Sequence, residues 1–159
     1  MKNLQSLVSL FLIAGLVYYS FYSLMPQEGS PSSVSETKFS TERALIPLKE
    51  ITKAPHYIGT TEHTRVREYL IGQLEELGLE TEVQEGFVIN PKWKSLDKPK
   101  NIIAQIKGSE NRKSLLLLSH YDSALTPSYG ASDAGSGVVT ILETLRAYKA
   151  SGKKPKNDI

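Results

Sequence analysis

The sequence predicts a three-layer α/β/α domain, of which this chain contains the N-terminal part, preceded by one transmembrane helix. Three observations lead to this prediction. A charge-free apolar segment lies at the N-terminus, segments with helical spacing follow it, and strand-like segments then lead to the fully apolar run Ser114–Ser119. A strand that is apolar on both faces is typical of the centre of a sheet that helices cover on each side. Because too few strands are available to flank it, the fold is expected to be unfinished at its C-terminus.

The N-terminal segment Leu4–Met25 contains no charged side chain and is long enough to cross a bilayer as a helix. Tyrosines near its C-terminal end suit the membrane–water boundary. A cleaved signal peptide is the alternative, but its apolar region is usually shorter, and Tyr22–Pro26 offers no small-x-small cleavage site. We therefore interpret residues 1–3 as a cytoplasmic N-terminus and residues 4–25 as a signal anchor. The folded domain is then expected on the extracytoplasmic side of a membrane, in a periplasm, an organelle lumen or the exterior.

Residues 26–38 are rich in Pro, Ser and Gly and lack hydrophobic periodicity, which predicts a flexible spacer. Residues 39–159 have a globular pattern and form the predicted partial α/β domain. The hydroxyl residues at 40–41 can cap a first helix and those at 60–61 a second, because apolar residues at helical spacing follow each pair.

Strand-like segments follow the two helices. Leu79–Ile89 alternates between apolar and polar residues, which indicates a half-exposed edge strand with a kink at Gly86. A polar loop over Asn90–Lys100 separates it from a second strand at Asn101–Ile106. After the apolar run, Ser136–Ala150 has the spacing of an amphipathic helix.

An imidazole and two carboxylates come directly after the predicted central strand. Ligands gather at the carboxyl ends of strands in open α/β sheets, and His120 and Asp122 occupy that position. If the chain stays extended through Tyr121, their side chains point to the same side. Asp133 follows thirteen residues after His120, flanked by glycines and ahead of the last helix. Such nitrogen and oxygen ligands suit zinc, and a carboxylate can bridge two cations.

The same residues also have structural interpretations. A lone His-x-Asp can be a hydrogen-bonded pair, and Asp133 can be an ordinary helix cap. Their spacing and strand–loop–helix context together favour a metal site. We interpret His56 and His63 as loop or capping histidines, and Glu143 as an outward-facing or packing residue of the last helix.

The segments HYDS and GASDAGSGVVTILETLRAY closely resemble the co-catalytic di-zinc aminopeptidases of metallopeptidase family 28. The resemblance extends from about Phe39 to the end of the chain, and the anchor is similar to the membrane-bound branch. It implies a zinc-exopeptidase-like fold in which His120 binds one zinc, Asp122 orients that histidine, and Asp133 bridges two zinc ions. Many family members have an acidic or amide residue where this chain has Ala134.

The function that the resemblance implies is zinc-dependent hydrolysis at the N-terminal residue of a peptide. The family's Glu–Glu pair, which contains the general base, a further acidic ligand and a late histidine do not occur in this chain. We therefore interpret the chain as truncated after the bridging aspartate, and expect this fragment to be inactive by itself.

Three alternatives remain open. A glutaminyl-cyclase-like acyltransferase has a similar HYDS segment but uses a single zinc and is less glycine-rich around its metal-binding aspartate. Carboxypeptidase-type relatives rank third, because a longer stretch separates their ligands. A non-catalytic, membrane-tethered interaction domain of the same fold is the alternative from another class.

The composition excludes several other classes. The formal net charge is only +2 and no basic stripe with aromatic residues occurs, so nucleic acid is not an expected partner. Cysteine is absent, which excludes disulfides and a cysteine nucleophile. The expected partners are a peptide substrate and the membrane.

Overall fold

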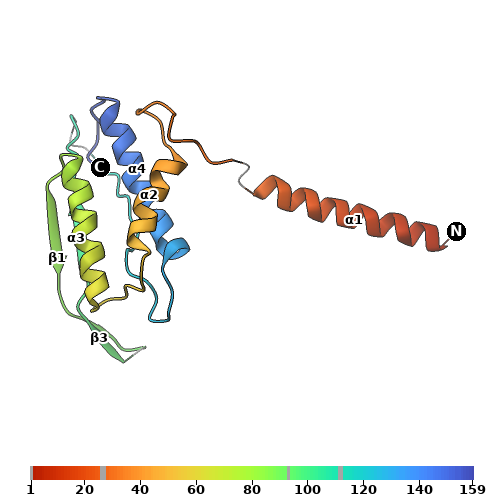
Figure 1. Ribbon diagram of the computed structural model, residues 1–159, viewed down its shortest axis with the longest axis horizontal. Coiled ribbons are helices and arrows are strands. Elements are labelled where there is room, and N and C mark those ends of the chain that lie inside the picture. The colour runs from red at the N-terminus through yellow and green to blue at the C-terminus, as the bar shows by residue number, and fades with distance from the viewer. Residues whose placement is uncertain (1, 26–27, 93, 111–112) are drawn as a thin grey trace.

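A computed structural model describes residues 2–25, 28–92, 94–110 and 113–159 (Figure 1). Met1 and residues 26–27 of the predicted spacer lie outside this description. Helix α1 (Lys2–Leu24) extends away from the rest of the chain. By length and composition, the segment Leu4–Leu24 could cross a membrane, and none of its residues is buried. The helix that the charge-free segment predicted is therefore present.

Hydroxyl side chains begin two of the domain's helices, as predicted. The Oγ atom of Ser40 accepts a hydrogen bond from the Arg43 N–H at 3.2 Å, and Oγ1 of Thr60 accepts one from the His63 N–H at 3.1 Å. Each bond satisfies one of the N–H groups that have no partner within a helix. The helices of the domain are α2 (Thr41–Ile51), α3 (Thr61–Glu76) and α4 (Ser136–Ala150).

Two small antiparallel sheets replace the single sheet expected from the sequence. The pairs are β1 (Thr81–Glu85) with β4 (Lys100–Ala104), and β2 (Val88–Asn90) with β3 (Ser95–Asp97). The predicted edge strand is interrupted at residues 86–87, which agrees with the kink expected at Gly86. The predicted polar loop between the strands instead contributes β3 to a hairpin.

The prediction of a buried central strand at Ser114–Ser119 is wrong for this structure. Only Ser114 forms a bridge, which is parallel and pairs it with Asp158. The leucines that follow are open to solvent, and Leu116 and Leu118 are 78% and 82% exposed. The reason is geometric: within the described residues only the short stretch around Asp158 pairs with the start of this segment, where the Leu115 N–H donates to the Asp158 carbonyl at 2.8 Å, and no further strand covers the leucines that follow.

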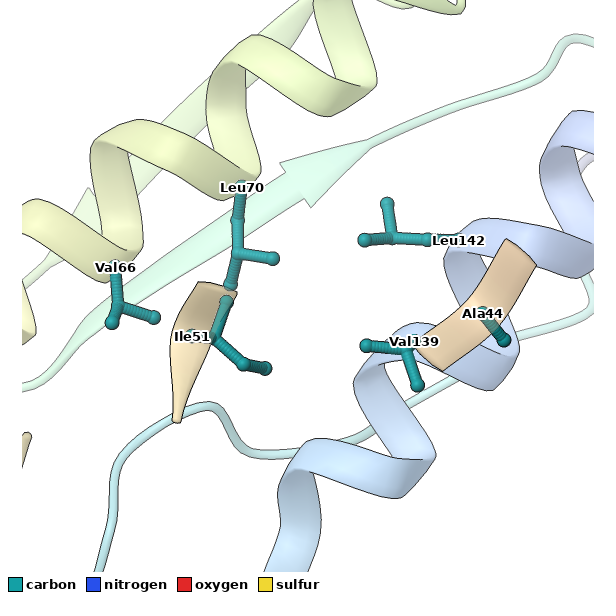
Figure 2. Packing of buried hydrophobic residues seen from close by; sticks show 6 residues of the cluster. All are labelled: Ala44, Ile51, Val66, Leu70, Val139 and Leu142. Carbon is teal, nitrogen blue, oxygen red and sulfur yellow. The ribbon is translucent and has the colours of Figure 1, made fainter. Parts of the chain in front are cut away.

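The core lies between the three helices of the domain (Figure 2). Aliphatic side chains from all three point toward one another there and are removed from water, which is the main favourable contribution to folding. They are Ala44 and Ile51 of α2, Val66 and Leu70 of α3, and Val139 and Leu142 of α4. The core therefore fastens α4, which follows the candidate site, to the two helices predicted from the N-terminal half of the domain.

The described part of the predicted spacer is hydrogen-bonded to the domain. The guanidinium of Arg43 donates to the carbonyl oxygens of Val34 at 3.0 Å and Lys38 at 2.8 Å. The N–H of Ser32 donates to the carboxylate of Glu42 at 2.7 Å. The sequence predicted flexibility because this segment is rich in Pro, Ser and Gly and lacks hydrophobic periodicity, but hydrogen bonds from Arg43 to its backbone carbonyls hold the described part against the domain.

A buried carboxylate joins this segment to α4. Glu143 is 4% exposed, so the outward-facing interpretation of this residue is wrong. Its carboxylate accepts hydrogen bonds from the Ser40 N–H at 2.9 Å, Arg43 Nε at 3.1 Å and Arg146 Nε at 2.7 Å. Burial by itself raises the pKa of Glu143, but the bonds from Arg146, Ser40 and Arg43 outweigh it, and the pKa lies below its usual value.

Candidate metal centre

The side chains of His120 and Asp133 converge. Nε2 of His120 lies 2.9 Å from Oδ1 of Asp133, although thirteen residues separate them along the chain. The other ring nitrogen, Nδ1, lies 3.1 Å from the backbone oxygen of Asp122 and 3.3 Å from its Oδ1. The structure therefore brings together all three residues that the sequence singled out, with Asp133 and Asp122 on opposite nitrogens of one imidazole.

This donor set fits part of a zinc site. Two ligand atoms on one tetrahedral zinc lie roughly 3.3 Å apart, given metal–ligand distances near 2.1 Å. The observed 2.9 Å between Nε2 of His120 and Oδ1 of Asp133 needs to open by only a few tenths of an ångström. Asp122, at the far nitrogen, is placed to hold the Nδ1–H through its backbone oxygen, with its carboxylate 3.3 Å away, and either acceptor can orient a zinc-binding histidine. Among the described residues, however, no group of three or more His, Cys, Asp or Glu side chains is placed to hold a metal ion.

Tyr121, which lies between His120 and Asp122, anchors this segment to the rest of the domain. The ring of Tyr121 stacks on that of His63 in α3, with ring centroids 4.8 Å apart, and its hydroxyl donates to the Lys100 carbonyl at 2.6 Å. Tyr121 thereby fastens the chain between His120 and Asp122 to α3 and β4.

Asp133 lies in the turn η1 (Ala131–Gly135), immediately before α4. Its backbone is extended rather than helical (φ −122, ψ 94), and the Asp133–Ala134 peptide bond is cis. The capping position of α4 belongs to Gly135, and no side chain caps it. The interpretation of Asp133 as an ordinary helix cap therefore does not hold. At 89% exposure its carboxylate is instead free to meet a ligand from solvent.

Gly130 makes the sharp entry into this turn possible. Its φ of +64 lies in the left-handed region, and a Cβ there would lie 3.2 Å from the Cβ of Ser123 and 3.3 Å from Cε1 of His56. The Gly130 carbonyl accepts a hydrogen bond from the Gly135 N–H at 2.8 Å, which closes the turn. Glycine is therefore required here both for its conformation and for the lack of space.

The two carboxylates also change the proton affinity of His120. Partial burial alone lowers the pKa of His120, but the hydrogen bond to Asp133 and the contacts with Asp122 raise it by more, so the pKa lies above its usual value. His63 behaves in the opposite way: burial lowers its pKa, and the nearby charge of Asp122 offsets this only in part. His120 is thus the more basic of these two imidazoles.

Sequence reasoning missed the residues that support this arrangement. His56 is almost fully buried, its N–H donates to Oγ of Ser123 at 2.8 Å, and its carbonyl accepts from the Ser123 N–H at 3.3 Å. Oγ of Ser119 donates to the carbonyl of Ala134 at 3.1 Å. No local pattern marks these contacts, because they join segments far apart in the sequence. The placement of both serines directly beside the HYD triplet was the available signal.

An open, mainly apolar cavity of about 740 Å³ lies beside the site. His120 and Asp122 line one part of it. Exposed leucines of the apolar run line another part, together with residues of α3, β4 and α4. The candidate ligands therefore lie at the border of a large apolar surface.

Comparisons with known proteins show which family and relatives the chain is similar to. The model of peptidase family M28 matches residues 101–159. A vacuolar membrane protease of Coprinopsis cinerea is 27% identical over 178 residues, covering 98% of this chain, but the chain spans only 18% of that relative's length.

Solved structures show the same likeness. A Zn-dependent exopeptidase from Parabacteroides distasonis is 26% identical, with a TM-score of 0.63 over 79% of this chain and 47% of its own. A glutaminyl cyclase of Bacteroides thetaiotaomicron is 27% identical, with a TM-score of 0.65 over 77% of this chain and 46% of its own. The predicted zinc-exopeptidase-like α/β fold class is thereby confirmed.

Proposed function

We propose that the chain, whose residues 101–159 match the model of peptidase family M28, supplies the His120–Asp133 part of the metal centre of a membrane-anchored zinc aminopeptidase. The observation that carries this proposal is the 2.9 Å approach of His120 Nε2 to Asp133 Oδ1, at the end of the segment that follows the apolar run. The substrate is a peptide with a free N-terminus, from which the enzyme removes the first residue.

Each residue has a distinct role in this proposal. His120 would hold zinc through Nε2, and Asp133, whose side chain is 89% exposed, would share its carboxylate between two zinc ions. Asp122 holds the Nδ1–H of His120, which selects the tautomer and increases the basicity of Nε2. Zinc, when bound, polarises a substrate carbonyl and lowers the pKa of a bound water. Because the described residues place no third ligand nearby, the 159-residue chain by itself is expected to bind zinc weakly and to lack turnover.

Zinc titration of the full chain in lipid nanodiscs tests the site. We expect saturable binding, detected by calorimetry and by a shift of the His120 ring signals in nuclear magnetic resonance, and loss of both in His120→Ala. Zinc binding that persists unchanged in His120→Ala would contradict the proposed centre.

A chimera tests the activity. Residues 101–159 would replace the matching segment of the Coprinopsis cinerea vacuolar membrane protease, and hydrolysis of an aminoacyl p-nitroanilide would be measured. We expect the chimera to be active and its His120→Ala form to be inactive. Turnover of the same substrate by the 159-residue chain alone, with zinc, would refute the expectation that it is inactive.

The likeness to a glutaminyl cyclase structure favours one second candidate, cyclisation of an N-terminal glutamine. Supplying the chimera with a glutaminyl peptide separates the two reactions, because hydrolysis releases free glutamine whereas cyclisation releases ammonia and leaves the peptide bond intact. Release of ammonia without free glutamine would favour the cyclase.

Helix α1 is proposed as a single-pass anchor with the domain on the extracytoplasmic side. Its apolar length and the membrane-protease relatives support this placement. Protease protection in sealed vesicles tests it: a domain in the lumen is cleaved only after detergent is added, whereas cleavage of intact vesicles would place the domain in the cytoplasm.

A further inference from the structure

One hydrogen bond connects the two ligand-bearing segments directly. Oγ of Ser119 donates to the backbone carbonyl of Ala134 at 3.1 Å. Ser119 immediately precedes His120, and Ala134 immediately follows Asp133. The bond therefore closes a short bridge beside the His120–Asp133 contact, one residue away from each side chain.

The site needs such a bridge because its own side chains are poorly restrained. His120 and Asp133 are 53% and 89% exposed, and neither packs in the core. No regular secondary structure holds residues 115–130. The separation of the two side chains must therefore be set by their backbones, and a hydrogen bond between the two backbone segments is suited to that task.

The far end of the same segment is held independently. Ser123 exchanges two hydrogen bonds with the backbone of His56, through its hydroxyl at 2.8 Å and its N–H at 3.3 Å. His120 thus lies between two fixed points. Of these two serines, Ser119 is the one whose hydroxyl donates a hydrogen bond to the turn that carries Asp133.

The first turn of α4 leaves room for this serine. A Cβ built on Gly137 would lie 2.6 Å from Oγ of Ser119 and 3.3 Å from its Cβ. A side chain at Gly137 would therefore force the hydroxyl to rotate away from the Ala134 carbonyl, because the hydroxyl is the movable end of that contact.

We propose that Ser119 is a positioning residue that sets the distance between His120 and Asp133, with Gly137 providing the space in which its hydroxyl reaches Ala134. As a statement about metal binding, this inference rests on the proposed function. The geometric part does not depend on that function, because it can be tested on the metal-free chain.

The geometric part is tested first, without metal, on the full chain in nanodiscs. Nuclear Overhauser cross-peaks between the His120 ring and the Asp133 β-protons report their proximity. We expect Ser119→Ala to weaken or remove these cross-peaks while leaving the stacking of Tyr121 on His63 unchanged. Ser151→Ala is the matched control, since Oγ of Ser151 also donates to a carbonyl, that of Tyr148, but at the remote end of α4. Wild-type cross-peaks in Ser119→Ala would overturn the proposal.

Gly137→Ala provides a second variant that keeps the serine. Alanine favours helix more than glycine does, so the helix itself is not weakened by this change. We nevertheless expect the cross-peaks to weaken as in Ser119→Ala, with the helical signal in circular dichroism retained. Gly72→Ala in α3 is the control, because a Cβ there meets nothing within 4 Å. Unchanged cross-peaks in Gly137→Ala would contradict the role given to the hydroxyl.

Zinc titration then separates the two proposals. The hydrogen bond between Ser119 and Ala134 supports the two ligands without touching the metal. Its loss in Ser119→Ala and Gly137→Ala is expected to reduce zinc affinity on the order of tenfold or more. If wild-type chain binds zinc through His120 and both variants bind it equally well, the positioning role fails while the metal centre stands. If zinc leaves the His120 signals of the wild type unchanged, the metal centre fails, and the metal-free cross-peaks still decide the geometry.

Discussion

Two carboxylates of this domain, Glu143 and Asp133, lie in opposite surroundings. Glu143 is 4% exposed and receives hydrogen bonds from the guanidinium groups of Arg43 and Arg146 and from a backbone N–H. Asp133 is 89% exposed and contacts one imidazole. A buried carboxylate requires full compensation by partners of the fold, whereas a carboxylate that binds a cation must keep oxygens open.

The two carboxylates therefore have different tasks: that of Glu143 stabilises the fold, and that of Asp133 is available to bind a ligand. The carboxylate of Glu143 joins α4 to α2 and to the segment before α2, so its charge is neutralised by partners within the fold. Asp133 is held by backbone contacts of its turn, so its charge remains available. Stability and metal binding should accordingly respond to different substitutions.

The largest effect is expected from Glu143→Ala. This change leaves Arg43 and Arg146 without their shared partner and the Ser40 N–H unsatisfied in a buried position. Removing one member of a buried ion pair typically lowers the free energy of unfolding by about 3–5 kcal/mol. Urea denaturation of the full chain measures the difference.

The matched control is Glu62→Gln, which removes a carboxylate that also pairs with an arginine, Arg65, at 2.8 Å but is 36% exposed. An exposed pair contributes about 0–1 kcal/mol, so this variant should unfold nearly as the wild type does. Equal losses in the two variants would show that burial does not distinguish these carboxylates.

A smaller loss in the free energy of unfolding is expected when the pH is lowered. The pKa of Glu143 is lowered from 4.5, because the bonds from Arg146, Ser40 and Arg43 outweigh the opposing effect of burial. Its ionised form therefore stabilises the fold fully above pH 4.5, and this contribution is lost as the pH falls below 4.5 toward the lowered pKa. The loss has a slope of at most about 1.4 kcal/mol per pH unit for one group.

Glu143→Gln isolates this contribution, because glutamine keeps the shape but does not titrate in this range. Denaturation at a series of pH values should show the wild-type stability falling more steeply in acid than that of the variant. Parallel curves for the two proteins would assign the acid sensitivity to other groups.

The smallest effect on stability is expected from Asp133→Asn. The free energy of unfolding should change by no more than about 0.5 kcal/mol, because the side chain is solvent-exposed. Zinc affinity should nevertheless fall at least about tenfold, because an amide is a much weaker ligand than a carboxylate. Asp97→Asn, on strand β3, removes the same charge away from the site and should leave zinc binding unchanged. A large loss of stability in Asp133→Asn would place this residue with Glu143 instead.

Much of the helical framework could be predicted from the sequence. Ser40 and Thr60 begin α2 and α3 as expected, since capping depends on a hydroxyl and the next few residues. The resemblance to family M28 is also confirmed, because it rests on a contiguous motif around His120 and Asp133. Of the two interpretations of Glu143, the outward-facing one was wrong, because one of its arginine partners lies a hundred residues away and no local pattern marks it.

Local sequence by itself determined the helices, the apolar N-terminal segment and the identity of the three candidate site residues, because these depend on neighbours within a few positions. Only the tertiary structure decided that Leu115–Leu118 stay exposed, that Glu143 is buried, and that Ser119 bridges to Ala134. Each of those outcomes depends on which distant segment lies alongside. A strand needs a neighbour for its backbone, a buried charge needs partners, and a ligand pair needs two loops held at one distance.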